Sequence, residues 1–127
     1  MRNFLFRHFR PFFAFILHPV QVFGAFASEC LRMHPHFYGT GETFVFRLDT
    51  PEPKVYTWTL KNDFFMYAGT RSFSFGGGAN FAIWIDEDLL HGNSQPCETF
   101  NSPALASTPD FEIAVLEVWG FDLGSSP

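Results

Sequence analysis

The sequence predicts a fold of the α+β class that is mainly β, an antiparallel β-sandwich with a few flanking short helices. Three observations predict it. Short apolar runs alternate with a period of two, as in strands that bury one face. Clusters of Gly, Pro, Asn and Asp separate the runs and are typical of turns. The 127-residue chain is 46% hydrophobic and contains 19 Phe residues, enough for one crowded core.

The first predicted element is a β-hairpin, with strands over residues 12–17 and 22–27 and a turn over residues 18–21. The start of the chain is rich in Arg and free of acids, so two other interpretations stay open. It also suits a mitochondrial presequence, or a secretory signal cleaved after Ala27. The hairpin is favoured because His18 and Pro19 interrupt the apolar run. That run is too short to cross a bilayer, so no transmembrane segment is predicted.

Later elements follow from alternation between apolar and polar positions. In the strand predicted over residues 43–48, Phe44, Phe46 and Leu48 alternate with polar or smaller residues. Helices are expected at two places only: a helical turn over residues 30–34, and a short helix after Ser107, where Ser107-x-x-Asp110 resembles a capping box. Further strands are predicted over residues 43–48, 54–60, 64–67, 72–75, 80–85 and 111–119.

Charge is distributed unevenly along the chain. The net charge is −5, and all eight Lys and Arg residues lie at or before Arg71. Such an acidic second half repels phosphate, so nucleic-acid binding through it is not expected. It is either a solvated face that maintains solubility, which is favoured, or a docking face for a basic surface. The acids after Arg71 are Asp86, Glu87, Asp88, Glu98, Asp110, Glu112, Glu117 and Asp122.

The residues do not form a recognisable catalytic or metal site. Two cysteines, Cys30 and Cys97, are too few for a disulfide framework and fit a reducing, intracellular setting. His34-Pro35-His36 lacks partners for a tetrahedral metal site. Ser94, His91 and Asp86 are close in sequence, but no GxSxG elbow surrounds the serine. No metal or cofactor is therefore predicted.

The glycine motifs also favour structural roles. Gly39-Thr40-Gly41 precedes a strand instead of a helix, so a tight turn is favoured over a dinucleotide site. The run from Gly76 to Gly78 lacks the Lys-Ser/Thr of a P-loop and fits a bulge or a close crossing of two backbones. Glu42, after the first glycine turn, is expected to be partly buried and bonded to turn amides.

Taken together, the motifs have a specific order and spacing, and they resemble the TLDc domain of the oxidation resistance proteins. The resemblance covers residues 22–121. Its family motif residues, expected to be mainly structural, are Gly39, Gly41, Glu42, Trp58, Gly76, Gly77, Gly78, Trp84, Asp86, His91, Gly92, Cys97, Phe100, Phe111 and Trp119.

The resemblance implies a β-sandwich and a non-enzymatic role in protection against oxidative stress, by protein–protein interaction. Subunits of the vacuolar proton pump (V-ATPase) are the implied partner, and cytoplasm, nucleus or mitochondrion the implied location. Candidate interaction residues are Glu42, Asp86 and Asp88. The alternative is a weak antioxidant enzyme or scavenger that uses Cys97 or Glu42.

The resemblance also divides the chain. It implies a partial TLDc-like domain over residues 12–121, preceded by a divergent segment, residues 1–11. The small and polar residues at the end of the chain predict a disordered tail over residues 122–127. A full domain has further helices and a strand upstream, and residues 1–10 do not resemble them. An N-terminally truncated domain is therefore expected, from a short isoform, an incomplete gene model or a divergent paralogue.

Overall fold

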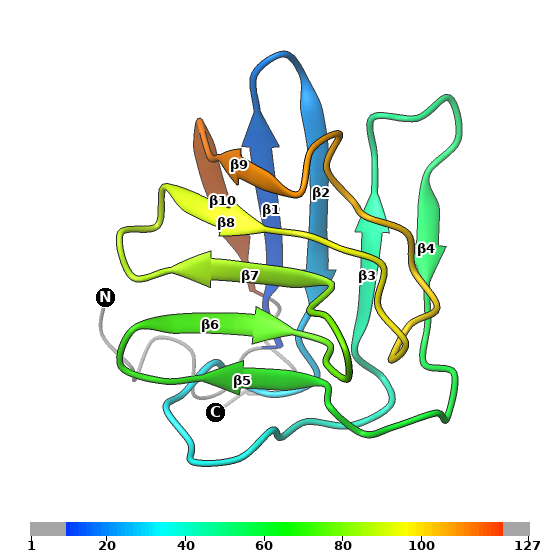
Figure 1. The fold of residues 1–127 in the computed structure, drawn as a ribbon, viewed down its shortest axis with the longest axis vertical. Helices are drawn as coiled ribbons and strands as arrows, with labels where there is room; N and C mark the ends of the chain where they lie inside the picture. The colour runs from blue at the N-terminus through cyan, green and yellow to red at the C-terminus, as the bar shows by residue number, and fades with distance from the viewer. Residues whose placement is uncertain (1–9, 121–127) are drawn as a thin grey trace, which may run out of the picture.

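A computed structural model of the chain describes residues 10–120. These residues form two antiparallel five-stranded sheets, which we call sheet 1 and sheet 2 (Figure 1). Sheet 1 has the order β10-β1-β2-β3-β4, and sheet 2 has the order β5-β6-β7-β8-β9. The strands of sheet 1 are β1 (Phe12–Leu17), β2 (Gln21–Phe26), β3 (Phe44–Arg47), β4 (Lys54–Tyr56) and β10 (Val115–Trp119). Those of sheet 2 are β5 (Met66–Ala68), β6 (Ser72–Phe75), β7 (Ile83–Asp86), β8 (His91–Asn93) and β9 (Asp110–Glu112).

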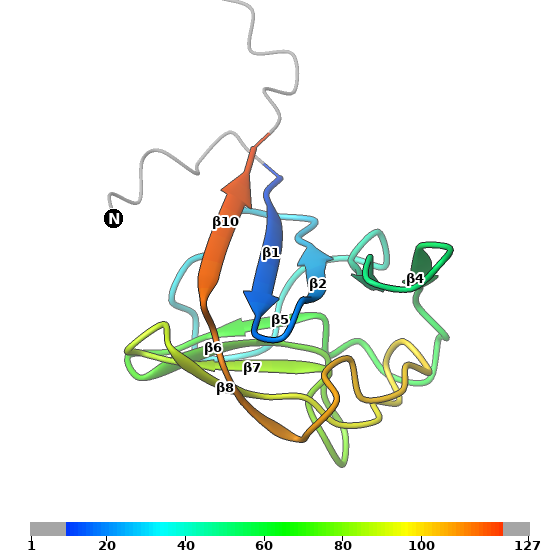
Figure 2. The same cartoon turned by 90° about the horizontal axis from the view of Figure 1, so that it is seen from above.

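The two sheets lie face to face, and their strands cross at a steep angle (Figures 1 and 2). Phe13 from β1 packs on Phe73 and Phe75 from β6, with ring centroids 5.7 and 5.5 Å apart. Phe23 from β2 meets Phe111 from β9 at 5.2 Å. These contacts join both sheets in one buried core, so the predicted β-sandwich is confirmed in its sheets.

The predicted N-terminal hairpin is confirmed, since β1 and β2 pair from Phe12↔Phe26 to Leu17↔Gln21. Strand β1 lies inside sheet 1, between β10 and β2. Its continuous apolar sequence matches this position, because residues on both of its faces are at least half-buried. Cleavage after Ala27 would remove two of the five strands of this sheet.

The predicted helices are wrong, because residues 10–120 contain no helix. Residues 30–34 lie along the edge of sheet 2, where the His34 N–H donates to the Ala68 carbonyl. Pro35 also disfavours a helical conformation at His34. After Ser107, Pro109 restricts Thr108 in the same way, and Asp110 begins β9 instead of capping a helix. Pairing with a sheet is favoured over local helix signals at both places.

The single strand predicted over residues 111–119 is two strands in different sheets. Strand β9 pairs with β8 in sheet 2, and β10 pairs with β1 in sheet 1. Between them, the Ile113 N–H donates to the Leu90 carbonyl at 2.7 Å and the Ala114 N–H to the Ile16 carbonyl at 2.8 Å. The chain therefore crosses from one sheet to the other at Ile113 and Ala114, which the regular alternation did not reveal (Figure 2).

Two other strand predictions need smaller corrections, and one strand was missed. The strand predicted over residues 54–60 ends at Tyr56, since the Thr59 N–H donates to the Thr99 carbonyl and not to a sheet neighbour. The strand predicted over residues 80–85 begins only at Ile83, and β8 was not predicted at all. Strand β8 contains His91, Gly92 and Asn93, none of which is a typical strand residue.

In β3 both faces are apolar. Val45 faces the core between the sheets, whereas Phe44 and Phe46 lie on the other side of sheet 1. There they pack with Phe12 and Phe26, and the Phe26 and Phe44 rings stack at 5.3 Å. The predicted alternation in this strand is correct, and the aromatic side forms a second, outer cluster.

The predicted segment at residues 1–11 and the predicted tail at residues 122–127 lie largely or wholly outside the described residues. Within residues 10–120, no helix has the length and apolar character needed to cross a membrane.

Candidate functional site

The glycine run is packed against the Cys97–Phe100 motif. Gly76 has φ +82°, and a Cβ atom there would lie only 2.6 Å from the Cys97 Sγ and 3.1 Å from the Phe100 Cε2. Any larger residue would be strained in its backbone and would clash with Cys97. The glycine run therefore crosses closely over the side chains of the Cys97–Phe100 segment, while the predicted bulge or close crossing of two backbones stays a prediction.

A buried threonine holds this crossing together. Gly77 donates its N–H to the Thr99 Oγ1 at 3.0 Å, and the same hydroxyl donates to the Asn62 Oδ1 at 2.7 Å. Cys97 is buried, and its thiol lies 3.5 Å from the Gly77 carbonyl oxygen. We call Asn62, Gly76, Gly77, Cys97, Thr99 and Phe100 the Thr99 cluster.

Trp58 connects the first glycine turn to this cluster. A Cβ at Gly41 would lie 2.2 Å from the Trp58 Cε3, so the indole ring occupies the space that a side chain would need. The Trp58 Nε1–H donates to the Asn62 carbonyl at 2.7 Å, and the ring packs edge-on to Phe65 at 5.1 Å. These motif residues, far apart in sequence, thus fill one another's space.

The remaining motif residues have separate positions. Gly92 pairs with Phe111 between β8 and β9, and Trp84 pairs with Asn93 between β7 and β8. Trp119 lies in β10, 61% exposed, with its Nε1–H donating to Glu117 at 3.1 Å. Gly39 and Gly78 have positive φ angles of 103° and 99°. None of these positions forms a convergent catalytic group.

The arrangement does not favour the catalytic alternatives. The Cys97 thiol is buried in the Thr99 cluster, whereas reactive thiols are usually partly exposed. Ser94 is also buried, and its Oγ accepts the Leu105 N–H at 2.8 Å, with no contact to His91. Among residues 10–120, no three His, Cys, Asp or Glu side chains are grouped as a metal ion would require. The His34–His36 pair is bound within its own loop.

The three candidate interaction acids lie in different surroundings. Glu42 is exposed and forms an ion pair with Arg10 at 3.1 Å, so its expected partial burial is not observed. Asp88 lies in the β7–β8 turn, where its side chain accepts the N–H groups of Leu90 and His91 and pairs with the His91 ring. These hydrogen bonds lower the pKa of Asp88 to about 2, and the carboxylate raises the pKa of His91. Asp86 ends β7.

Asp86 borders a hollow that the motif series did not indicate. We call this hollow, with a volume of about 470 Å³, the main hollow because of its apolar lining; a depression between the β1–β2 turn and β9 is larger, at about 520 Å³. Its floor is the buried aromatic pair Phe13 and Phe73, and its sides include Leu31, Met33 and Leu89. Its charged lining residues are Arg32, Asp86 and Glu87. A smaller depression of about 370 Å³, the side hollow, shares Met33, Ala68, Gly69 and Thr70 with the main hollow.

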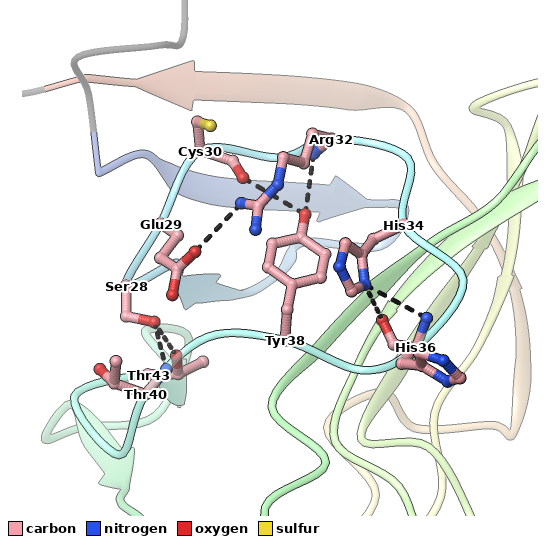
Figure 3. Close-up of polar contacts among 9 residues, drawn as sticks. All are labelled: Ser28, Glu29, Cys30, Arg32, His34, His36, Tyr38, Thr40 and Thr43. Carbon is pink, nitrogen blue, oxygen red and sulfur yellow. Dashed lines mark hydrogen bonds and ion pairs between the residues drawn. The ribbon is translucent and has the colours of Figure 1, made fainter.

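One side of the main hollow is loop 28–38, which joins β2 to β3 and is drawn in Figure 3. The loop folds around the side chain of its last residue, Tyr38. The Tyr38 hydroxyl accepts the Arg32 N–H at 2.8 Å and donates to the Cys30 carbonyl at 3.3 Å. Burial raises the pKa of Tyr38, so the hydroxyl stays protonated as this donation requires. The Arg32 guanidinium lies 4.2 Å from the Tyr38 ring centroid and pairs with Glu29 at 3.0 Å.

Both ends of this loop are fixed to the sandwich. Near its start, the Ser28 Oγ accepts the Thr40 N–H and the Thr43 hydroxyl, each at 2.8 Å (Figure 3). Near its end, Tyr38 exchanges two backbone hydrogen bonds with Met66 on β5, of 2.8 and 3.0 Å. The loop therefore covers the edge of sheet 2 and presents Met33 at a fixed place.

Most of the main hollow was not predicted from the sequence, because only one of its lining residues, Asp86, belongs to the motif series. One signal was available. Leu89 and Leu90 follow the acids Asp86, Glu87 and Asp88 directly, which places apolar and acidic side chains together in a turn. No comparable signal marked Leu31, Arg32 and Met33, whose position depends on contacts with Tyr38 and β5.

Known proteins are similar to this chain over most of its length. The sequence profile of the TLDc domain matches residues 5–122. Oxidation resistance protein 1 of Homo sapiens is 50% identical over 103 residues, which are 80% of this chain and 12% of that protein. The same protein of Rattus norvegicus is 48% identical with the same coverage. Nuclear receptor coactivator 7 of Homo sapiens is 43% identical over 80% of this chain and 11% of its own length. The chain thus spans only about an eighth of these relatives.

Proposed function

The chain belongs to the TLDc domain family, and on this premise we propose that it is a non-enzymatic protein-interaction module in protection against oxidative stress. Relatives at 43 to 50% identity include proteins named for oxidation resistance and for coactivation of nuclear receptors. Both the role in oxidative stress and the mode of action by binding are our proposals for this chain.

One observation carries the binding part of the proposal: the main hollow combines exposed apolar side chains with acids. Met33 is 64% exposed and Leu89 is 41% exposed, although both are large apolar residues. Exposed apolar side chains gathered around a hollow are typical of interaction sites. The buried Cys97 and the salt-bridged Glu42, by contrast, give no support to a scavenging mechanism.

As partner we propose subunits of the vacuolar proton pump, in an intracellular setting. The resemblance to the TLDc family suggests the pump, and the charge distribution supports a partner with a basic surface, since no Lys or Arg follows Arg71. Cys30 and Cys97 are both free thiols, which fits a reducing compartment.

Affinity purification of the tagged full chain from cells, with and without peroxide treatment, tests this function. We expect pump subunits to be enriched over a tag-only control, and expression of the chain to improve survival in peroxide. The variant Phe100→Ala, which should unfold the Thr99 cluster, is expected to lose both effects. If a folded wild-type chain enriches no pump subunit and gives no protection, the proposed function is wrong.

A further inference from the structure

We propose that the main hollow and the side hollow together bind a short segment of a partner protein, one that presents two apolar side chains next to lysine or arginine. This inference rests on the proposed function and describes the chemistry of its partner. The shape, the apolar lining, the charge and the rigidity of the two hollows support it.

The shape suits an extended segment. The main hollow, at about 470 Å³, is within the range of sites that hold a ligand group. The side hollow adjoins it and shares Met33, Ala68, Gly69 and Thr70 as lining. Two adjoining depressions separated by a common set of side chains accommodate two successive anchors of one chain better than one compact molecule.

The lining is apolar where the anchors would lie. Phe13 and Phe73 form a buried aromatic floor, with ring centroids 5.7 Å apart. Met33 and Leu89, from separate elements, remain exposed above it. An apolar side chain in the main hollow would remove both from water, and methionine adapts to anchors of different shape. In the side hollow, Tyr67 and Pro35 offer a second apolar surface.

The charge at the main hollow favours a basic partner. Asp86 and Glu87 line it, and within the described part of the chain neither forms an ion pair. The one cation in the lining, Arg32, is already paired with Glu29 at 3.0 Å. Arg71 lies in the nearby β5–β6 turn but lines neither hollow. Among the described residues, a lysine or arginine of the partner would therefore find two carboxylates that are not already held in ion pairs.

Both walls are held in place before binding. Loop 28–38 is fixed by the Tyr38 hydroxyl and by the backbone bonds to Met66 described above. The β7–β8 turn is closed by the Leu89 N–H, which donates to the Asp86 carbonyl at 3.0 Å, and by the Asp88 side chain. A partner would lose little affinity to ordering these walls.

Selection of random dodecapeptides displayed on phage against the immobilised full chain tests the inference. We expect enriched peptides to combine two apolar residues, such as Leu, Phe or Trp, with neighbouring Lys or Arg. Their affinity should fall as salt concentration rises. No enrichment, or an enriched pattern that is acidic or lacks apolar residues, would overturn the proposal.

Matched variants locate the binding. The double variant Asp86→Asn/Glu87→Gln, which removes two charges without changing shape, should weaken the enriched peptide by about tenfold or more. Met33→Ser should weaken it to a similar extent. The control Glu52→Gln/Asp63→Asn changes net charge by the same amount at exposed sites outside both hollows and should leave the affinity within about twofold. Equal weakening by both double variants would refute a local site, and so would unchanged affinity in all variants.

The same variants separate this inference from the proposed function. If wild type and the Asp86→Asn/Glu87→Gln variant purify equally well with pump subunits, the module binds its partner elsewhere. The inference about the hollow is then wrong, whereas the proposed function stands. If the folded wild type enriches no pump subunit and gives no protection, the proposed function fails, whereas the peptide selection still decides what the hollow binds.

Discussion

Four of the six residues of the Thr99 cluster are family motif residues, whereas the main hollow contains only one, Asp86. The cluster is buried and closed by hydrogen bonds between a glycine run and a threonine. The hollow is open and presents Met33 and Leu89 to solvent. This difference indicates that the motif series, by which the family is recognised, encodes the scaffold. Binding chemistry lies on residues that the scaffold positions.

The largest expected effect is on the cluster. Phe100→Ala removes a buried ring beneath Gly76 and should lower the free energy of unfolding by about 3–5 kcal/mol. Chemical denaturation followed by Trp fluorescence measures it. Phe81→Ala, at a partly exposed position, is the control and should cost less than about 1 kcal/mol. Similar losses in both variants would contradict the special role of the cluster.

A second, smaller effect concerns the glycine crossing. Gly76→Ala places a Cβ 2.6 Å from the Cys97 Sγ at φ +82°, and should destabilise the fold by about 1–3 kcal/mol. At Gly69 a Cβ would be no closer than 3.4 Å to any neighbour, so Gly69→Ala should change stability by less than about 1 kcal/mol. Thermal melting of the two variants compares them directly, and equal melting temperatures would count against a close crossing.

The hydrogen bonds of the cluster are expected to contribute less than its packing. Thr99→Val keeps the shape but leaves the Gly77 N–H without its acceptor, at a cost of about 1–3 kcal/mol, whereas the Asn62 Oδ1 loses one donor and keeps the Phe64 N–H. Thr57→Val, at an exposed position, should alter stability by about 0.5 kcal/mol at most. Urea denaturation of both would show whether Thr99 acts through its hydroxyl; a neutral Thr99→Val would exclude that.

Hollow variants should behave in the opposite way. Met33→Ser and Asp86→Asn/Glu87→Gln are expected to change the free energy of unfolding by no more than about 0.5 kcal/mol. Met33 and Glu87 are exposed, and an asparagine in place of the half-buried Asp86 keeps the Oδ1 that accepts the Glu87 N–H. Denaturation curves that coincide with wild type, together with weaker peptide binding, would separate the two regions. A loss of stability comparable to that of Thr99→Val would show that the hollow residues also support the fold, and would contradict the separation of the two regions.

The smallest expected effect is the pH response of the β7–β8 turn beside the hollow. Asp88 raises the pKa of His91 above its ordinary value of 6.5. The stability that protonated His91 adds to the folded state is therefore fully present below pH 6.5 and is lost as pH rises through the folded pKa. The pKa of Asp88 is lowered to about 2. The stability that its carboxylate adds to the folded state is therefore fully present above pH 3.8 and is lost as pH falls towards 2. NMR titration of the His91 ring should show a raised pKa that returns towards 6.5 in Asp88→Asn. An identical titration in both proteins would rule out the pairing.

The part of the fold that the sequence predicted correctly is the part specified by local patterns. Residues 12–17 and 72–75 alternate or run apolar between clear turn signals, and both strands appear with those bounds. The helix after Ser107 was wrong because β9 gains partners from β8, which no local pattern of His91, Gly92 and Asn93 announces. The crossing between sheets at Ala114 is likewise fixed by a distant contact, with Ile16.

The candidate site was less predictable for the same reason. Asp86 and Asp88 were singled out from the acid run, but only Asp86 lines the main hollow. Glu42 was expected to bind turn amides, yet it is exposed and pairs with Arg10. Met33 and Leu89 are 56 positions apart in the sequence. They line the same hollow only because loop 28–38 is bound to β5. Tertiary contacts, which a sequence pattern does not report, create the site.

Hydrogen exchange of the full chain, with and without the peptide enriched by selection, tests the division between scaffold and binding surface most directly. Bound peptide should slow exchange in the segments that line the two hollows, residues 31–35, 67–70 and 86–89, and leave residues 97–100 of the Thr99 cluster unchanged. Slower exchange in residues 97–100 or along sheet 1, with the hollows unaffected, would contradict the account.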